Sequence, residues 1–132
     1  RSLPGLGDIL GARVLAEFGD APDRYADARA RRNYAGTAPV TRASGTSHVV
    51  VARLVRNRRL FDACYGWAFS ALRASPGARA SYDDHDPGPR TGKTARRKLA
   101  NKLVGILHGC LAHRTLYDEE LAWHRRVEEL AA

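Results

Sequence analysis

Methionine is absent from this chain, cysteine occurs only twice, and long apolar runs are missing. No apolar stretch approaches the roughly 20 residues that cross a bilayer, and no signal-peptide pattern opens the chain, so we expect no membrane partner. Both cysteines, Cys64 and Cys110, fall on the apolar stripes of expected helices. This placement favours buried free thiols in a reducing cytoplasm over a disulfide.

Without an initiator methionine, the chain opens abruptly at Arg1, directly on a glycine-containing turn motif. We therefore expect a single domain, residues 1–132, that is a fragment of a longer protein. A length of 132 residues with a hydrophobic content of 44% is sufficient to bury one core without disulfides.

Acidic residues are scarce relative to basic ones. The chain has 14 Asp and Glu against 22 Lys and Arg, which leaves a formal net charge of +8. Lysine occurs only at positions 93, 98 and 102, and arginine supplies the other cations. The arginine guanidinium stays charged and binds phosphate with two parallel hydrogen bonds, so this balance favours nucleic acid as a partner. GC-rich codons would also enrich arginine, and both explanations hold at this point.

Strand-like alternation is nearly absent, whereas apolar residues recur at helical spacing in most segments. A loop is expected from Gly36 through Ser47. Val49–Val51 fits either a short strand, which its β-branched residues favour, or the entry to the next helix. The fold class is therefore mainly α, a compact helical domain. The expected helices cover about 8–18, 23–34, 58–74, a short one ending near 82, 94–114, and one beginning near 117.

The segment Pro4-Gly5-Leu6-Gly7 precedes an amphipathic helix and is typical of the hairpin in a helix-hairpin-helix motif, here without its first helix. Gly5 and Gly7 would let the backbone approach a phosphate, and the N–H groups at the helix start would face it. Such contacts position a duplex without reading its sequence. A plain glycine turn before a helix is the alternative.

A second basic cluster, Lys93, Arg96, Arg97 and Lys98, lies at the start of the expected helix 94–114. Cations at a helix N-terminus are disfavoured by the helix dipole, and a bound phosphate backbone would offset this cost. We therefore predict nucleic-acid contacts there, with a solvated helix end as the alternative. The segment 88–94 is not a P-loop, because only three residues separate its first glycine from Gly-Lys-Thr.

Two groups of potential metal ligands are present, and neither has the spacing of a metal site. Residues 83–86, Asp-Asp-His-Asp, are adjacent in a polar turn rather than arranged to close around an ion. His108, Cys110 and His113 are two and three residues apart, so they do not share one helix face. We expect no metal and no cofactor within this chain.

The stretch Arg-Ala-Ser-Gly-Thr-Ser-His, residues 42–48, places three hydroxyls within four residues. Ser44 is a nucleophile only if a base removes its proton and cations stabilise the charge that forms. Arg42, His48 and Arg53 are local candidates for stabilising charge, and His48 is also a candidate base. Loop and capping hydroxyls are the alternative, which residue chemistry alone favours.

Five short segments stand out in order along the chain. They are Leu-Pro-Gly-Leu-Gly-Asp (3–8), Leu-Ala-Glu-Phe-Gly-Asp (15–20), Tyr-Ala-Gly-Thr-Ala-Pro-Val (34–40), Ala-Ser-Gly (43–45) and Asn-Arg-Arg-Leu (57–60). Together with the late helix 95–114, these segments resemble, over nearly the whole chain, the C-terminal transposase domain of the DEDD-type insertion-sequence transposases of the "one-ten" family. A departure is Val55-Arg56-Asn57-Arg58, where the family usually has a Lys/Arg-Gly-Asn-like turn.

The resemblance implies that Ser44 attacks DNA, with Gly45 as its neighbour. It also implies an N-terminal RuvC-like domain, absent from this chain, whose four carboxylates hold Mg²⁺, and a guide (bridge) RNA that pairs with DNA. That domain would come from the same or another protomer, so we expect a homo-oligomer for the full-length protein. The fragment alone is expected to bind nucleic acid without cutting it.

A non-catalytic helix-hairpin-helix module that binds nucleic acid is the main rival to this interpretation, and a structural or oligomerisation domain is a third. The first two interpretations share one set of nucleic-acid contacts. These predicted contacts are Gly5, Gly7, Arg42, Arg53, Arg56, Arg58, Arg59, Lys93, Arg96 and Arg97.

Overall fold

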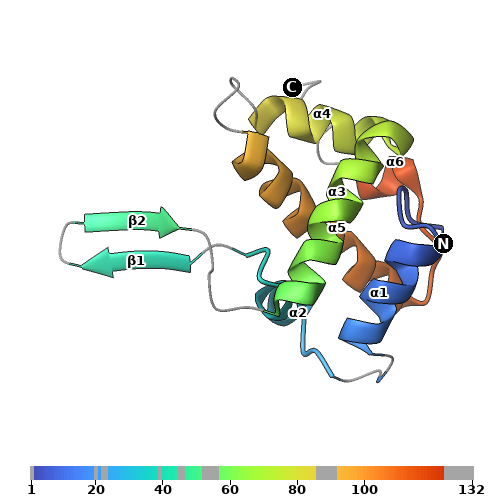
Figure 1. The fold of residues 1–132 in the computed structure, drawn as a ribbon, viewed down its shortest axis with the longest axis horizontal. Helices are drawn as coiled ribbons and strands as arrows, with labels where there is room; N and C mark the ends of the chain where they lie inside the picture. Colours follow the sequence, from blue (N-terminus) through green and yellow to red (C-terminus); the bar gives the residue numbers. More distant parts are fainter. Residues whose placement is uncertain are drawn as a thin grey trace.

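The computed structural model describes residues 2–19, 21, 24–38, 40–44, 47–51, 57–85 and 92–123. It confirms the mainly α fold class, with the helices packed into one body and a two-stranded hairpin beside it (Figure 1). Within the described residues, no helix is both long and apolar enough to cross a membrane. The elements are α1 (Asp8–Phe18), α2 (Ala28–Ala35), β1 (Val40–Ser44), β2 (Ser47–Val51), α3 (Arg58–Ala74), α4 (Pro76–His85), α5 (Gly92–His113) and α6 (Glu119–Ala122).

The predicted boundaries of α1 and α3 are confirmed at both ends, and local capping explains why. Gly19 ends α1 with φ 76°, and its N–H donates to the Leu15 carbonyl at 2.8 Å. Asn57 begins α3, because its side-chain oxygen accepts a hydrogen bond from the Leu60 N–H at 3.2 Å. Asp27 caps α2 in the same way, so this helix begins at residue 28 rather than near 23.

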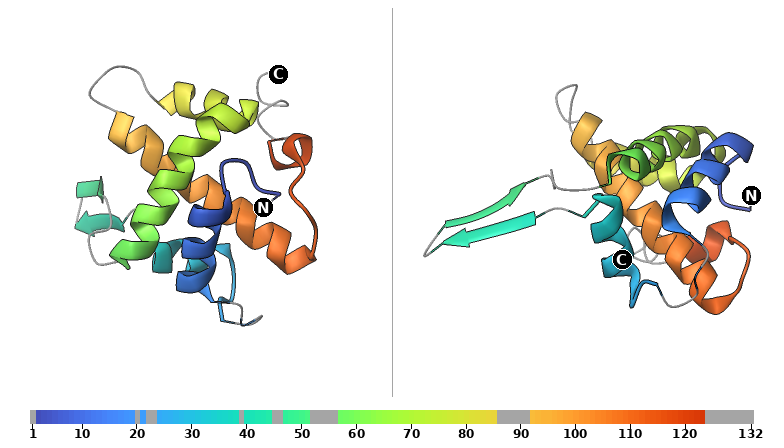
Figure 2. Two further views of the ribbon diagram at one scale, coloured as in Figure 1. Left: turned by 45° about the vertical axis from the view of Figure 1, so that its right-hand side comes forward. Right: turned by 60° about the horizontal axis from the view of Figure 1, so that its bottom comes forward.

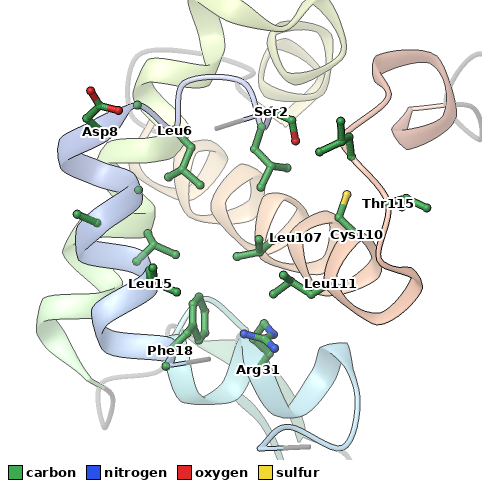
Figure 3. Close-up of a pocket in the computed structure, with 17 residues that line it drawn as sticks. Ser2, Leu6, Asp8, Leu15, Phe18, Arg31, Leu107, Cys110, Leu111 and Thr115 are labelled. Atoms are coloured by element: carbon green, nitrogen blue, oxygen red, sulfur yellow. The ribbon is translucent and has the colours of Figure 1, made fainter. Parts of the chain in front are cut away.

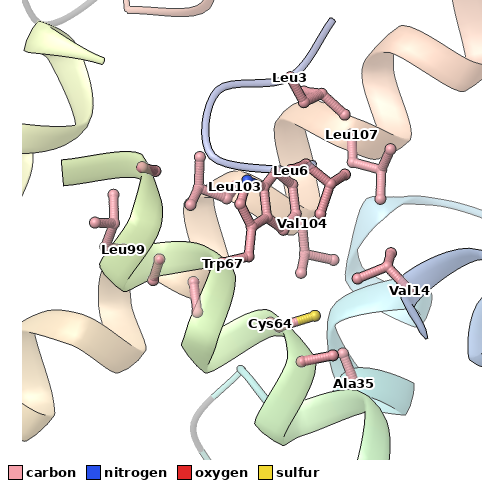
Figure 4. Packing of buried hydrophobic residues seen from close by; sticks show 14 of the residues in the cluster. Leu3, Leu6, Val14, Ala35, Cys64, Trp67, Leu99, Leu103, Val104 and Leu107 are labelled. Atoms are coloured by element: carbon pink, nitrogen blue, oxygen red, sulfur yellow. The ribbon is translucent and has the colours of Figure 1, made fainter. Parts of the chain in front are cut away.

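Helix α3 occupies the centre of the helical body. It packs against α1, α4 and α5, while α2 and α4 also lie against α5 (Figure 1). The Trp67 indole is fully buried between the N-terminal turn and α5, beside Leu6 and Leu103 (Figure 4). Its Nε1–H donates to the Pro4 carbonyl at 2.7 Å, so the largest core side chain also satisfies its polar group. This bond fixes the N-terminal turn to α3.

Gly5 is required at this turn for two reasons. Its φ of 78° is a conformation that residues with a Cβ rarely adopt, and a Cβ there would lie 2.5 Å from the Ala71 backbone nitrogen. The turn itself is closed by the Leu6 N–H, which donates to the Leu3 carbonyl at 3.2 Å. Gly5 therefore brings the turn into direct contact with the backbone of α3.

The segment after α5 is held against the start of α4. The Glu119 carboxylate accepts hydrogen bonds from the Ser75 hydroxyl and the Gly77 N–H, each at 2.8 Å, and from the Tyr117 hydroxyl. Trp123 is buried over Gly77, and its Nε1–H donates to the Tyr117 oxygen at 2.9 Å. A carboxylate at a helix N-terminus is favourable, so Glu119 stabilises both α4 and the chain end that carries it.

Strands β1 and β2 form an antiparallel hairpin that extends away from the helices (Figures 1 and 2). The strand considered at Val49–Val51 is confirmed and begins at Ser47. The expected loop from Gly36 through Ser47 is wrong over residues 40–44, which form β1, and at Ser47, which begins β2. Alternating apolar and polar residues mark strands that pack one face on a core. This hairpin stands clear of the core, so its sequence carries no such signal.

Replacement of Gly5 by alanine should lower the free energy of unfolding by about 1–3 kcal/mol, because the new Cβ meets the α3 backbone and the backbone is strained. Gly109→Ala is the matched control: it lies within α5, where a Cβ would meet nothing within 4 Å, and should stabilise by about 0.5–1 kcal/mol. Urea unfolding followed by circular dichroism measures both. Equal effects of the two replacements would contradict the packing of the turn on α3.

Candidate functional site

Ser44 lies at the end of β1, where the hairpin is farthest from the helices. In the strand register it pairs with Ser47, while Ala43 pairs with His48 and Arg42 pairs with Val49. The predicted site residues Gly45, Arg53 and Arg56 lie outside the described residues. The structure therefore brings Ser44, Arg42 and His48 into one two-stranded unit, as positions along its backbone.

The chain that enters the hairpin is fixed to α5 through Thr37. This residue is fully buried, and its hydroxyl donates to the Asn101 side-chain oxygen at 3.2 Å. The Thr37 carbonyl accepts a hydrogen bond from Arg97 Nη1 at 3.4 Å. The start of the hairpin is thus held by side chains that come 60 and 64 residues later in the sequence.

The chain that leaves the hairpin is fixed by Asn57. While its oxygen caps α3, its Nδ2 donates to Glu17 Oε2 at 2.9 Å and to the Tyr34 hydroxyl at 3.3 Å. Asn57 therefore links α1, α2 and α3 at one point. In the sequence, Asn57 was expected only as part of a pattern shared with the family. An asparagine just before an apolar helical repeat is the capping signal that identifies its role.

Basic residues occupy the N-termini of α3 and α5, and in α3 the nearest acidic residue along the helix is Asp62, one turn further on. Arg58 and Arg59 are exposed in the first turn of α3, and Lys93 and Lys98 are exposed near the start of α5. Neither first turn contains an acidic residue. Both helix starts therefore combine exposed positive side chains with the positive end of the helix dipole, an arrangement that attracts anions.

Arg96 and Arg97 differ from these exposed cations, because both are half-buried and bind backbone carbonyls. Arg96 Nε donates to the Tyr65 carbonyl at 2.8 Å, and its guanidinium lies 3.9 Å from the centre of the Tyr65 ring. Arg97 donates to Thr37, as described above. Both side chains hold elements together, in addition to any contact with nucleic acid that the sequence predicts for them.

The two glycines of the N-terminal turn have different surroundings. Gly5 faces the backbone of α3, whereas a Cβ at Gly7 would meet nothing within 4 Å. Gly7 precedes α1 without a side-chain cap, and Asp8 places a carboxylate in the first helical turn. Of the two predicted phosphate contacts, Gly7 is therefore the one whose Cα faces open space.

No group of three or more His, Cys, Asp or Glu side chains is placed to hold a metal ion within the described ranges. Asp83 lies in α4 and pairs with Arg79 at 3.3 Å. His108 Nδ1 accepts a hydrogen bond from Arg31 Nε at 3.0 Å. The described residues of this chain therefore do not fit a magnesium or zinc site.

An apolar groove of about 510 Å³ lies between α1 and α5 (Figure 3). Leu15, Leu111 and Leu116 line it and are more than half exposed. At one end, beside Phe18 and Leu111, lies Arg31 (Figure 3).

Arg31 is only 6% exposed, and its guanidinium lies 4.8 Å from the Phe18 ring centre and 4.3 Å from that of Tyr25. Burial lowers the pKa of Arg31. Burial of His108 and the positive charge of Arg31 beside it together lower the pKa of His108. Sequence reasoning missed this arginine, because the basic segment 29–32 looks like a solvated helix face.

The region of the hairpin and α3 is also the region that matches a protein family. Residues 1–83 match the model described as the transposase IS116/IS110/IS902 family. The chain belongs to this family. The match covers the N-terminal turn, the hairpin with Ser44 and the whole of α3.

Curated relatives extend the family match into α5. A Streptomyces coelicolor mini-circle protein, named as a transposase for IS117, is 52% identical over 122 residues, which are 92% of this chain. An uncharacterized 43.6 kDa protein of insertion element IS110 from the same species is 33% identical over 91% of the chain. An uncharacterized 42 kDa protein of insertion element IS900 from Mycobacterium paratuberculosis is 35% identical over 88%. The chain spans about 30% of the length of these relatives.

The lowered pKa of His108 predicts a pH dependence of stability. The unfolded chain binds a proton near the usual value of about 6.5, above the folded pKa, so stability is complete above that value and is lost as pH falls through the folded pKa. His108→Gln should make the melting temperature depend less on pH between about pH 8 and pH 5. His113→Gln, at an exposed position of the same helix, should leave the wild-type profile unchanged. Equal profiles for wild type and His108→Gln would contradict the assignment.

Proposed function

We propose that this chain is the DNA-binding and catalytic domain of an insertion-sequence transposase, in which Ser44 attacks a DNA phosphodiester. Membership of the transposase family supports the general activity. The observation that carries the assignment to Ser44 is its position at the end of a hairpin that stands clear of the helical body (Figure 2). At that position the phosphodiester backbone of a long, rigid DNA duplex can approach Ser44 without colliding with the helices.

The proposed reaction is a transesterification. A bond forms between Ser44 Oγ and phosphorus, while the bond from phosphorus to the departing strand end breaks. The serine proton passes to a base, and the departing strand end leaves as a hydroxyl after it gains a proton. The phosphodiester linkage is kept in the phosphoserine, so a new strand end can later replace the serine without an external energy source.

Three residues near Ser44 are proposed for supporting roles. Arg42, two positions earlier in β1, would stabilise the negative charge that develops on the phosphate. His48, on the paired strand, is the base that the sequence suggests, although the register pairs it with Ala43 and therefore places it on the other face of the hairpin from Ser44. Gly45 follows Ser44 directly and would leave room for the phosphate.

Further components are proposed from the family resemblance. A RuvC-like domain, from the same or another protomer, would hold Mg²⁺ through its own carboxylates, since the described residues here hold no suitable cluster. Bound Mg²⁺ supplies charge stabilisation at the phosphate. The full-length protein would form a homo-oligomer in the cytoplasm and would bind DNA and a guide RNA.

A non-catalytic module for nucleic-acid binding is the second candidate function. The observation that favours it is the pair of basic helix starts at α3 and α5, which attract phosphate whether or not Ser44 reacts. In this alternative the predicted contacts only position nucleic acid. The backbone at Gly7, in the proposed helix-hairpin-helix turn, would lie close to a phosphate.

In the full-length protein with RNA and Mg²⁺, Ser44→Ala should abolish the covalent adduct with DNA. Labelled donor DNA is mixed with protein, quenched in denaturant and separated on a gel, and the label that travels with protein is measured. Because the nucleophile is lost, adduct and strand exchange should fall by at least roughly 10³-fold.

Ser47→Ala is the control, since it removes the same hydroxyl from the residue paired with Ser44. It should retain both the adduct and DNA affinity. An adduct that survives Ser44→Ala would assign another nucleophile, and recombination without any adduct would favour the binding module.

Replacing both Arg58 and Arg59 with glutamine should weaken the salt dependence of duplex DNA binding by the 132-residue chain. Each phosphate contact contributes a slope of about −0.9 in log K against log salt, so the slope should flatten by about two units. Arg13→Gln with Arg29→Gln removes the same charge from exposed positions of α1 and α2 and should leave the slope nearly unchanged. If both pairs give the same slope, α3 does not provide specific phosphate contacts.

A further inference from the structure

A second surface hollow, of about 560 Å³, lies where α3, α4 and α5 meet. Its volume is within the range of small-ligand sites, roughly 300–1,000 Å³. Aromatic and basic side chains dominate its lining. The lining residues are Tyr65, Phe69, Leu72, Arg79, Tyr82, Lys93 and Arg96.

The aromatic part of this hollow is a stripe along α3. Phe61, Tyr65 and Phe69 are spaced four residues apart and therefore share one helix face. The rings of Phe61 and Tyr65 are stacked, with centres 5.6 Å apart and planes at 17°. Phe69 continues the stripe and is 55% exposed, although large aromatic rings normally contribute to a core.

Arg96 sets the position of this stripe from the side of α5. Its guanidinium lies 3.9 Å from the Tyr65 ring centre and 5.0 Å from that of Phe69, and its Nε is held by the Tyr65 carbonyl. The two aromatic rings and the guanidinium thus form a fixed platform. Planar arginine and aromatic groups in this arrangement stack with nucleobases.

The cations of the hollow differ in their partners. Arg79 is paired with Asp83 at 3.3 Å, and its guanidinium lies 5.7 Å from the Tyr82 ring centre. Among the described residues, no carboxylate is paired with Lys93 or Arg96. Lys93 is also exposed at the start of α5, where the helix dipole adds to its charge. A ligand with an anionic group beside a flat apolar ring would complement both parts of the hollow.

We propose that this hollow binds an unpaired nucleotide of single-stranded nucleic acid, with the base stacked on Phe69 and the phosphate beside Lys93 and Arg96. The inference rests on the proposed binding of nucleic acid and adds to it a site that accepts only an unpaired base. A base within a duplex is already stacked on both faces and cannot present its ring to Phe69. The site therefore distinguishes single-stranded from fully paired nucleic acid.

The test uses the 132-residue chain and a single-stranded DNA oligonucleotide that contains the fluorescent base 2-aminopurine, with a fully paired duplex of the same sequence as the comparison. Wild-type protein should quench the fluorescence as the base stacks. Phe69→Leu, which keeps an apolar side chain but removes the aromatic ring, should abolish the quenching and weaken single-strand binding by roughly 5- to 150-fold. Duplex affinity should not change.

Leu111→Ala is the matched control, because Leu111 is also 55% exposed but lies in the groove between α1 and α5. It should bind both DNAs as the wild type does. Lys93→Gln should weaken single-strand binding without abolishing the quenching. An RNA oligonucleotide of the same sequence shows whether the sugar matters.

Three outcomes would overturn the inference. If Phe69→Leu binds and quenches like the wild type, the base does not stack there. If the wild type binds duplex but not single strands, this site fails while the proposed function stands. If it binds neither, both proposals fail. Unfolding curves of Phe69→Leu are expected to match those of the wild type, and the substitution Phe69→Tyr, which keeps the ring, should retain quenching.

Discussion

The hydrogen bond from Trp67 to the Pro4 carbonyl is the interaction on which the helical arrangement depends. A buried indole N–H without an acceptor would be costly, and the N-terminal turn supplies that acceptor at 2.7 Å. To do so the turn must approach α3 closely, which requires Gly5 against the Ala71 backbone. The turn leads directly into α1, so the same bond also sets where α1 lies on α3. Trp67 thus links the N-terminal turn to α3 within the region that matches the transposase family.

Much of this architecture could be predicted from the sequence because its signals are local. Helices α1 and α3 have apolar repeats of helical period and visible caps, Gly19 and Asn57, so both ends were predictable. Strand β1 was not predictable, because a hairpin that stands clear of the core has no buried face and therefore no alternation of apolar and polar residues. The N-terminus of α2 is set by Asp27, which caps the helix. Earlier polar residues were also possible caps, so the sequence did not show which of them begins the helix.

The candidate site was predictable as a set of residue types, but the roles of individual cations were not. Sequence shows where arginine occurs, whereas its function depends on partners that folding supplies from far away. Arg97 meets Thr37 across 60 residues, and Arg31 meets His108 across 77. Such arginines bind within the protein, while Arg58, Arg59 and Lys93 remain exposed. The position of Ser44 on a hairpin followed only from the register, and its chemistry stays a prediction.

The separation of the hairpin from the helical body has an evolutionary consequence. The core constrains α1, α3 and α5 jointly, because a change of volume at one buried position disturbs its neighbours. The strands pair with each other and are joined to that core through fixed points at Thr37 and Asn57. The strand residues 40–44 and 47–51 can therefore vary without selection for core packing. A lineage of such domains is free to diversify what the hairpin contacts while the scaffold that carries it stays nearly constant.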